Sequence, residues 1–223
     1  MEKKRKEWSK KQKDFRTILL SFSNNQKAIE LFMAQHAFLH SSKVSTTVPY
    51  SYADAILSDM KEVQWRRIPI SEEHSTAWCI WHLARIEDIT MNLLIADSSQ
   101  LFLESDWQDR LNIDRLDAGN AMSYEELHAL STHINIQELQ KYRDEVGIRT
   151  REIVKKLTTE RLKEKVDPVG IERIMDERAL VPESRNIADY WSRRNIAGLL
   201  LMPPTRHCFV HLNEVLRIKQ KKK

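Results

Sequence analysis

Apolar residues recur along most of the chain at the three- and four-residue spacing that places them on one face of a helix. This pattern predicts long helices at residues 24–42, 71–96 and 136–157. It predicts shorter helices at residues 51–60, 124–130 and 187–202, and a last helix that begins at Pro203. Four glycines and six prolines are few for 223 residues, as is typical of chains with long helices. We therefore expect an all-α protein.

Capping residues mark the starts of two of these helices. Ser71, followed by acidic residues, is a good N-cap for the helix at 71–96, and Ser123 with Glu126 predicts a capping box. Residues 97–120 and 158–182 have a looser pattern and are expected to form connections. No internal repeat or boundary divides the sequence, so we expect one domain over residues 1–223.

The net charge of +4 is concentrated at the two ends of the chain. Residues 1–16 and the lysines from 219 to 223 carry a net +9, which leaves −5 for the residues between them. We expect a core from about residue 24 to 218, with basic tails that are solvated. The sequence has no basic stripe interleaved with aromatic residues, so nucleic acid is not an expected partner.

Two further features concern the cellular compartment. The chain has no run of eighteen apolar residues and no apolar core of a secretory signal after its basic N-terminus, so neither a membrane span nor secretion is expected. Cys79 and Cys208 do not have the spacing of a metal knuckle, and two cysteines suit a reducing compartment. We expect a cytoplasmic protein.

Two histidines stand four residues apart on the last predicted helix. His207 and His211 lie one turn apart on one face, where two imidazoles can bind one metal ion. Pro203 and Pro204 suit a helix start, which puts His207 in the first turn, where the helix dipole favours neutral imidazole. The spacing alone is weak evidence, because a histidine pair on the surface explains it equally well.

A third histidine, His82, strengthens the case for a metal site. It falls within an apolar stripe formed by Trp78, Ile86, Ile89 and Leu93, so it is expected to point into the core. A buried histidine needs a partner, and a backbone hydrogen bond is the commoner one. Three histidines from two helices, however, form the open ligand set of a catalytic metal site. His82, His207 and His211 are therefore the candidate ligands.

Several other side chains are candidates for supporting roles. Glu214 could orient a ligand imidazole or act as a base, with a surface carboxylate as the alternative. Arg85 and Arg206 could bind a substrate carboxylate, with structural salt bridges as the alternative. Cys208 is expected to be a buried thiol rather than a nucleophile. A second histidine pair, His36 and His40, lies near the end of the helix at 24–42, and the sequence leaves open whether either residue reaches the metal.

Two segments together resemble a known family. Residues 75–88 read STAWCIWHLARIED and residues 205–214 read TRHCFVHLNE. Both are similar to the DinB-like (DinB/YfiT-like) superfamily of metalloenzymes, and the resemblance extends over about residues 24–218. It implies an up-down-down-up four-helix bundle, to which this chain adds short helices. It also implies that His82, His207 and His211 bind a divalent metal ion.

The resemblance also implies a range of activities. Family members include transferases and isomerases that couple low-molecular-weight thiols, such as bacillithiol or mycothiol, to electrophiles. We therefore expect a metal-dependent enzyme of the thiol-transferase type, with a small-molecule substrate and a homodimeric assembly. A metal-dependent hydrolase and a non-catalytic metal-binding or stress-associated interaction protein are the alternatives. Zinc is the first choice of metal because imidazole suits it, whereas nickel, iron and manganese remain open.

Overall fold

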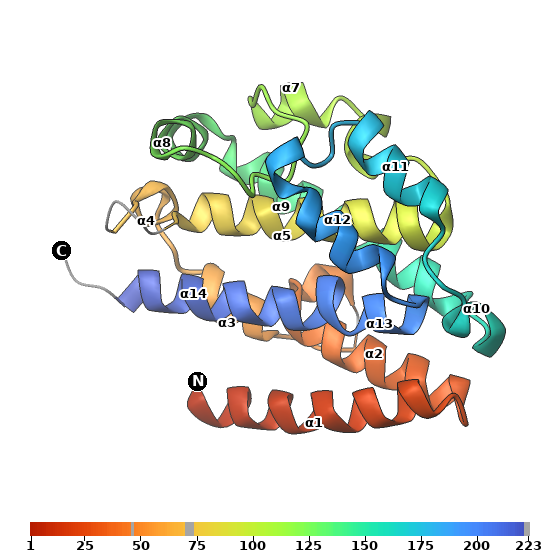
Figure 1. Ribbon diagram of the computed structural model, residues 1–223. Coiled ribbons are helices and arrows are strands. Elements are labelled where there is room, and N and C mark those ends of the chain that lie inside the picture. The colour runs from red at the N-terminus through yellow and green to blue at the C-terminus, as the bar shows by residue number, and fades with distance from the viewer. Residues whose placement is uncertain (46, 70–73, 221–223) are drawn as a thin grey trace.

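The computed structural model describes residues 1–45, 47–69 and 74–220, and these residues form helices and no strand. The all-α prediction is confirmed. The long helices are α1 (Glu2–Ser21), α2 (Asn25–Leu39), α5 (Thr76–Ile89), α9 (Ile136–Lys155) and α14 (Cys208–Gln220). Helix α5 packs against α9 and α14, and Figure 1 shows that α5 and α14 lie side by side and run in opposite directions. The up-down-down-up order of a minimal bundle stays a prediction.

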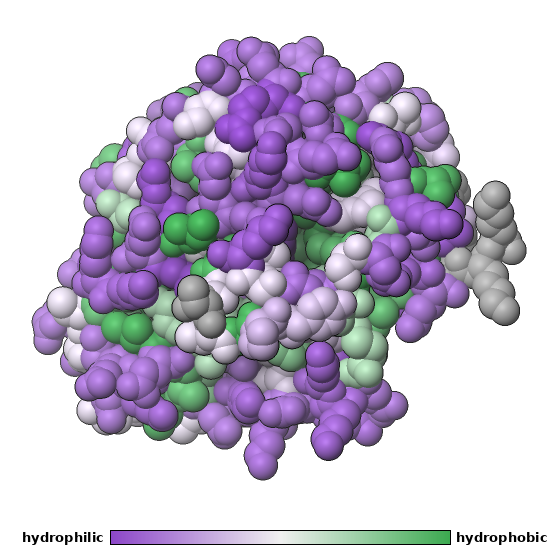
Figure 2. Space-filling model, turned by 180° about the vertical axis from the view of Figure 1, so that it is seen from behind, coloured by the Kyte–Doolittle hydropathy of each residue, from purple (hydrophilic) through white to green (hydrophobic). Residues whose placement is uncertain are grey.

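Short helices connect and cover the long ones (Figure 1). They are η1 (Ser42–Val44), α3 (Tyr52–Leu57), α4 (Glu62–Arg66), η2 (Thr90–Ala96), α6 (Leu101–Glu104), α7 (Trp107–Leu111), α8 (Tyr124–His133), α10 (Thr159–Lys163), α11 (Pro168–Asp176), η3 (Pro182–Ser184), α12 (Arg185–Ser192), α13 (Ile196–Leu200) and η4 (Met202–His207). No helix within the described ranges is both long and apolar enough to cross a membrane. On the face opposite to Figure 1, hydrophilic residues predominate and apolar ones form scattered groups (Figure 2).

The predicted helix starts are confirmed where local capping decides them. Asn24 caps α2 by accepting a hydrogen bond from the backbone N–H three residues later, and Ser123 with Glu126 forms the capping box of α8. The start of the helix predicted at 71–96 is wrong: α5 begins at Thr76, because Ser75 caps it by accepting a backbone hydrogen bond of 2.9 Å. The predicted cap Ser71 lies outside the described residues.

The N-terminal segment differs from the solvated tail that its lysines suggest. Residues 2–21 form α1, which packs along α2, and its side chains Trp8, Phe15 and Leu19 are buried. Trp8 also stacks on Phe209 of α14, with ring centroids 4.0 Å apart. These apolar residues are seven and four positions apart among charged ones, so they form one narrow buried stripe. The packed core therefore begins well before residue 24.

The prediction of one continuous helix at 187–202 is wrong. The chain forms α12 and α13 as separate helices, because Asn195 interrupts the run and caps α13 through a 2.8 Å hydrogen bond from the N–H of Gly198. Pro203 and Pro204 do not open a new α-helix either. They lie inside η4, a wide π-helical turn that continues directly into α14. His207 is the last residue of this turn rather than a first-turn residue of the final helix.

Helix α9 approaches α2 closely at a glycine. A Cβ atom added to Gly147 would lie 2.6 Å from Cδ2 of His40 and 3.0 Å from Cγ1 of Val44. A side chain at this position would therefore collide with the histidine ring. The glycine, which costs helix stability by itself, leaves the space that the imidazole of His40 fills.

Candidate metal centre

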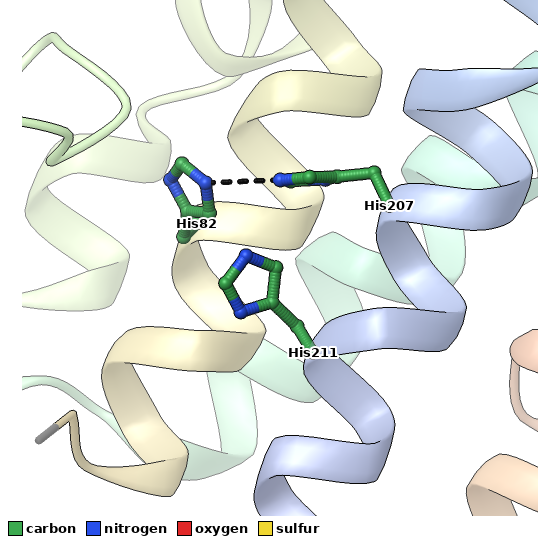
Figure 3. Close-up of side chains that lie close together, drawn as sticks. All are labelled: His82, His207 and His211. Atoms are coloured by element: carbon green, nitrogen blue, oxygen red, sulfur yellow. Dashed lines mark hydrogen bonds between the residues drawn. The ribbon is translucent and has the colours of Figure 1, made fainter.

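The three candidate ligands lie together between two helices. His82 projects from α5, whereas His207 and His211 project from the end of η4 and from α14, and the rings point toward one another (Figure 3). The Nε2 atoms of His82 and His207 are 3.2 Å apart, and the three ring centroids are 4.7 to 5.1 Å from one another. One ligand atom of each residue lies within 4.8 Å of the others. This compact triangle has the donor set of a metal site.

The orientation of His82 is fixed by the backbone. Its Nδ1 lies 2.7 Å from the carbonyl oxygen of Ala118, which can only accept, so Nδ1 carries the proton and Nε2 offers a lone pair to the triangle. Burial, followed by the charge of His211, lowers the pKa of His82 to about 3. The imidazole is therefore neutral at physiological pH, which is the form that binds metal.

Burial also keeps His207 neutral. Burial first, and the neighbouring His82 second, lower the pKa of His207 well below its usual value. The dipole of a first helical turn is not the cause, because His207 ends the wide turn η4. Its Nδ1 is buried and has no hydrogen-bond partner among the residues that the structure describes.

Glu214 connects His211 to a further histidine. Its Oε2 lies 2.8 Å from Nδ1 of His211, and its Oε1 lies 2.8 Å from Nδ1 of His74, next to α5. Burial tends to raise the pKa of Glu214, but the hydrogen bonds from His211 and His74 outweigh it and lower that pKa. Because an ionised carboxylate only accepts, His211 is protonated at Nδ1 and turns Nε2 toward His82. Glu214 thus sits beside the triangle as an orienting group and not as a solvated surface acid.

An aromatic stack supports the triangle from the side of α5. The ring of Trp78 lies between His74 and His82, with centroid distances of 3.6 Å and 4.6 Å and nearly parallel planes. The same indole meets His211 edge-on at 5.9 Å. The stack limits the rotation of His82 and covers one side of the site with apolar surface.

The two candidate arginines have different environments. Arg85 is fully buried, where its guanidinium donates to Asp88, Tyr142, Gln100 and the carbonyl of Leu116. Asp88 and Asn92, which follow Arg85 at helical spacing, are also buried, so this polar group is not exposed to solvent. It joins α5 to α9 and to the chain before α6.

Arg206 is exposed and faces a separate surface cavity. This cavity of about 470 Å³ is also lined by Arg16, Lys165, Arg193 and Arg194. His82, His207 and His211 line neither this cavity nor three others, of about 560 to 680 Å³, within the described residues. An anion held by Arg206 would therefore lie in this basic cavity.

A second histidine group lies deeper in the protein. His36 and His40 of α2 meet Glu87 of α5, with His36 Nε2 2.8 Å from Oε1 and His40 Nε2 3.0 Å from Oε2. All three residues are buried. Sequence reasoning did not identify Glu87, although an acid inside an otherwise apolar helix, combined with a histidine pair four residues apart, is a usable signal. His36 and His40 thus pair with Glu87 in a group of their own.

Both cysteines are buried thiols. Burial, and then the charge of Glu214, raise the pKa of Cys79, which forms a third group of donor atoms with His74 and Glu214. Burial, and then Glu87, raise the pKa of Cys208. The expectation that Cys208 is a buried thiol is confirmed. Histidine and carboxylate groups that could hold a metal ion are therefore present at more than one place in the described chain.

One comparison with known proteins, the comparison with protein families, gives a match. The search of curated proteins finds no match. The family model of the DinB superfamily matches residues 50–202, from the residues before α3 to the start of η4. The match includes His82, whereas His207 and His211 lie beyond its end at residue 202. Since the matched range covers more than half of the sequence, and the fold is helical as the resemblance implies, this chain belongs to the DinB superfamily.

Proposed function

We propose that His82, His207 and His211 bind one divalent metal ion. The observation that carries the proposal is the convergence of three imidazoles. In two of them the Nδ1 atom, which faces away from the other rings, forms a hydrogen bond to another group. Ala118 holds Nδ1 of His82 and Glu214 holds Nδ1 of His211, which directs both Nε2 atoms into the triangle, where they can act as ligands. Such outer partners are typical of metal-binding histidines.

The donor set agrees with zinc. Neutral imidazoles suit Zn²⁺, and three protein ligands leave a coordination position open, as in catalytic zinc sites. Nickel, iron and manganese accept the same ligands, so metal analysis decides among them. His207 and His211 are only partly buried, which allows a small molecule to approach from their side.

The reaction that we propose is the transfer of a low-molecular-weight thiol to an electrophile. When bound, a divalent ion in this site supplies the Lewis acidity that makes a thiol nucleophilic near neutral pH. The protein positions the ligands through Glu214 and Ala118 and shields one side of the site with the indole of Trp78. Glu214 acts in this proposal as an orienting group rather than as a base, because its lowered pKa and its hydrogen bonds to His211 and His74 make it a weak proton acceptor.

Two alternatives share the same residues. A metal-dependent hydrolase would activate water in place of a thiol. A non-catalytic protein would use the ion to join α5 to α14, and the burial of His82 favours this alternative. A cytoplasmic location, expected from the cysteine content and the other sequence features, and a homodimer, expected from the family resemblance, accompany the proposal.

The test combines metal analysis with turnover. We would purify the protein without an affinity tag and compare wild type with His211→Ala and with His128→Ala, a control at an exposed histidine of α8. We expect His211→Ala to carry about one metal equivalent less than the other two proteins. Equal metal content in all three would refute the site.

Turnover then separates the reactions. Cysteine or glutathione is mixed with 1-chloro-2,4-dinitrobenzene. The thiol sulfur bonds to the ring carbon, chloride leaves and the thiol proton passes to solvent. We expect chelation or His211→Ala to abolish this activity. Hydrolysis of p-nitrophenyl acetate without thiol transfer would favour the hydrolase. A metal-loaded protein that is inactive in both assays would favour the non-catalytic alternative.

A further inference from the structure

The group of His36, His40 and Glu87 contains the donors of a second metal site. The two imidazoles come from the last turn of α2 and from its C-cap residue, and the carboxylate comes from α5. One donor atom of each residue lies within 4.8 Å of the others. We propose that these three side chains bind a structural divalent metal ion, separate from the one at His82, His207 and His211. Two imidazoles and a carboxylate are a common ligand set for zinc.

Unpartnered nitrogen atoms indicate that the group lacks a component. His40 Nε2 lies 3.0 Å from Glu87 Oε2 but outside hydrogen-bonding geometry, and neither ring nitrogen of His40 has a hydrogen bond within the described residues. His36 forms a hydrogen bond with Glu87 through Nε2, and its Nδ1 has no hydrogen-bond partner within the described residues. A fully buried imidazole without a partner costs free energy. A cation between the two Nε2 atoms and the carboxylate would satisfy His40 and His36 together.

The surroundings hold the donors in place. The two rings stack with centroids 3.9 Å apart, so their Nε2 edges lie on the same side of α2. Phe32 stacks on the other face of His36 at 5.3 Å, and Gly147 of α9 leaves room for the ring of His40. Rings fixed by packing on both faces lose little side-chain freedom when they bind an ion.

The charged side chains around this group affect how well it can hold a cation. Arg143 of α9 is buried close to these histidines, and its positive charge opposes a cation. Glu87 supplies one compensating negative charge. The thiol of Cys208 lies 3.7 Å from Glu87 Oε2 and donates to it, which helps to hold the carboxylate in place. His36, His40 and Glu87 have no contact with solvent, so an ion among them would not be open to a substrate, as is expected of a structural site rather than a catalytic one.

The two sites are separate because of the geometry of α5. His82 and Glu87 are five residues apart, which is roughly 140° around a helix. Their side chains therefore project to different sides of α5. The group at His36 contacts α2, whereas the group at His82 contacts α14 and the carbonyl of Ala118.

The test counts metal ions in matched variants. A closed site is filled during folding, so each untagged protein is unfolded, refolded with zinc, desalted and analysed for zinc per chain. Glu87→Gln keeps the shape and hydrogen-bonding capacity of the side chain but removes its charge, and His211→Ala removes a ligand of the other site. Circular dichroism verifies that each variant is helical. We expect about two equivalents in wild type, about one in each variant and none in the double variant.

The other outcomes separate the two proposals. One equivalent in wild type that is kept in Glu87→Gln and lost in His211→Ala would overturn the second site and leave the proposed function intact. One equivalent that is kept in His211→Ala and lost in Glu87→Gln would support the second site and contradict the proposed function. Zinc-free wild type after refolding would overturn both. If Glu87→Gln does not refold, His40→Gln in the same experiment replaces it, with loss of one equivalent as the expected result.

Discussion

His207 and Cys208 are consecutive residues that contact two different groups of candidate metal ligands. His207 reaches His82 with its Nε2, at 3.2 Å, whereas the sulfur of Cys208 reaches Glu87 Oε2 at 3.7 Å. The junction between η4 and α14 therefore touches both groups on α5. A change in the position of this junction would disturb both groups at once.

The first prediction concerns Glu214. Replacement by Gln removes the carboxylate that His211 and His74 share, so His211 loses its orienting charge while all three proposed ligands remain. We expect zinc affinity to fall by about 10- to 100-fold, measured by competition with a chromophoric chelator. The matched control is Glu172→Gln, an exposed acid that bonds to Arg185. Equal affinity in both variants would contradict an orienting role for Glu214.

The second prediction concerns Gly147. Alanine normally stabilises a helix interior by about 1 kcal/mol relative to glycine. Here the added Cβ would lie 2.6 Å from the ring of His40, so we expect Gly147→Ala to lower the free energy of unfolding by about 1 to 3 kcal/mol. Urea denaturation measures this change in the free energy of unfolding. Gln140→Ala, at an exposed position of the same helix, serves as the control and is expected to be nearly neutral. A stabilised Gly147→Ala would mean that the ring of His40 lies elsewhere.

The third prediction distinguishes the two arginines. Replacing Arg85 by Met leaves the buried Asp88 without its cation, and we expect a loss of about 3 kcal/mol or more in the free energy of unfolding. Arg206→Met alters an exposed side chain, and we expect a change within about 0.5 kcal/mol. Chemical denaturation of both variants provides the comparison. Similar stabilities would show that the network around Arg85 contributes little to folding.

The fourth prediction concerns the thiols. Cys79 and Cys208 are fully buried, and burial raises the pKa of both. We expect neither thiol of the native protein to react with Ellman's reagent, and both to react after unfolding in guanidinium chloride. A Gln140→Cys variant, with its thiol in an exposed position, verifies that the reagent works under native conditions. Rapid labelling of the native wild-type protein would contradict the burial of these thiols.

Local signals made part of the fold predictable. Apolar periodicity identified α2, α5 and α9, including the start of α2 near residue 24, and the capping box at Ser123 is confirmed because a cap depends on residues within one turn. The wide turn η4 could not be predicted in this way, since proline usually indicates a helix start. The break before α13 depends on Asn195, which is a residue that also occurs inside helices.

The candidate site was predictable to a similar extent. His82 was identified because a histidine within an apolar stripe must point into the core, and the spacing of His207 and His211 placed them on one face. The partners of these residues depend on which helix faces meet. The contacts of Glu214 with His74 and of Glu87 with His36 join positions 140 and 51 residues apart, and no local pattern encodes them.

The packing of Trp8 on Phe209 has a practical consequence for shortened forms of this protein. A chain cut at residue 24 to remove the lysine-rich segment would lose α1 and uncover Phe209, which lies between His207 and His211 in the sequence but on the far side of α14 from His211. Metal titrations on such a fragment would then measure a loosened helix rather than the native site. The basic N-terminus is part of the scaffold that supports the histidines.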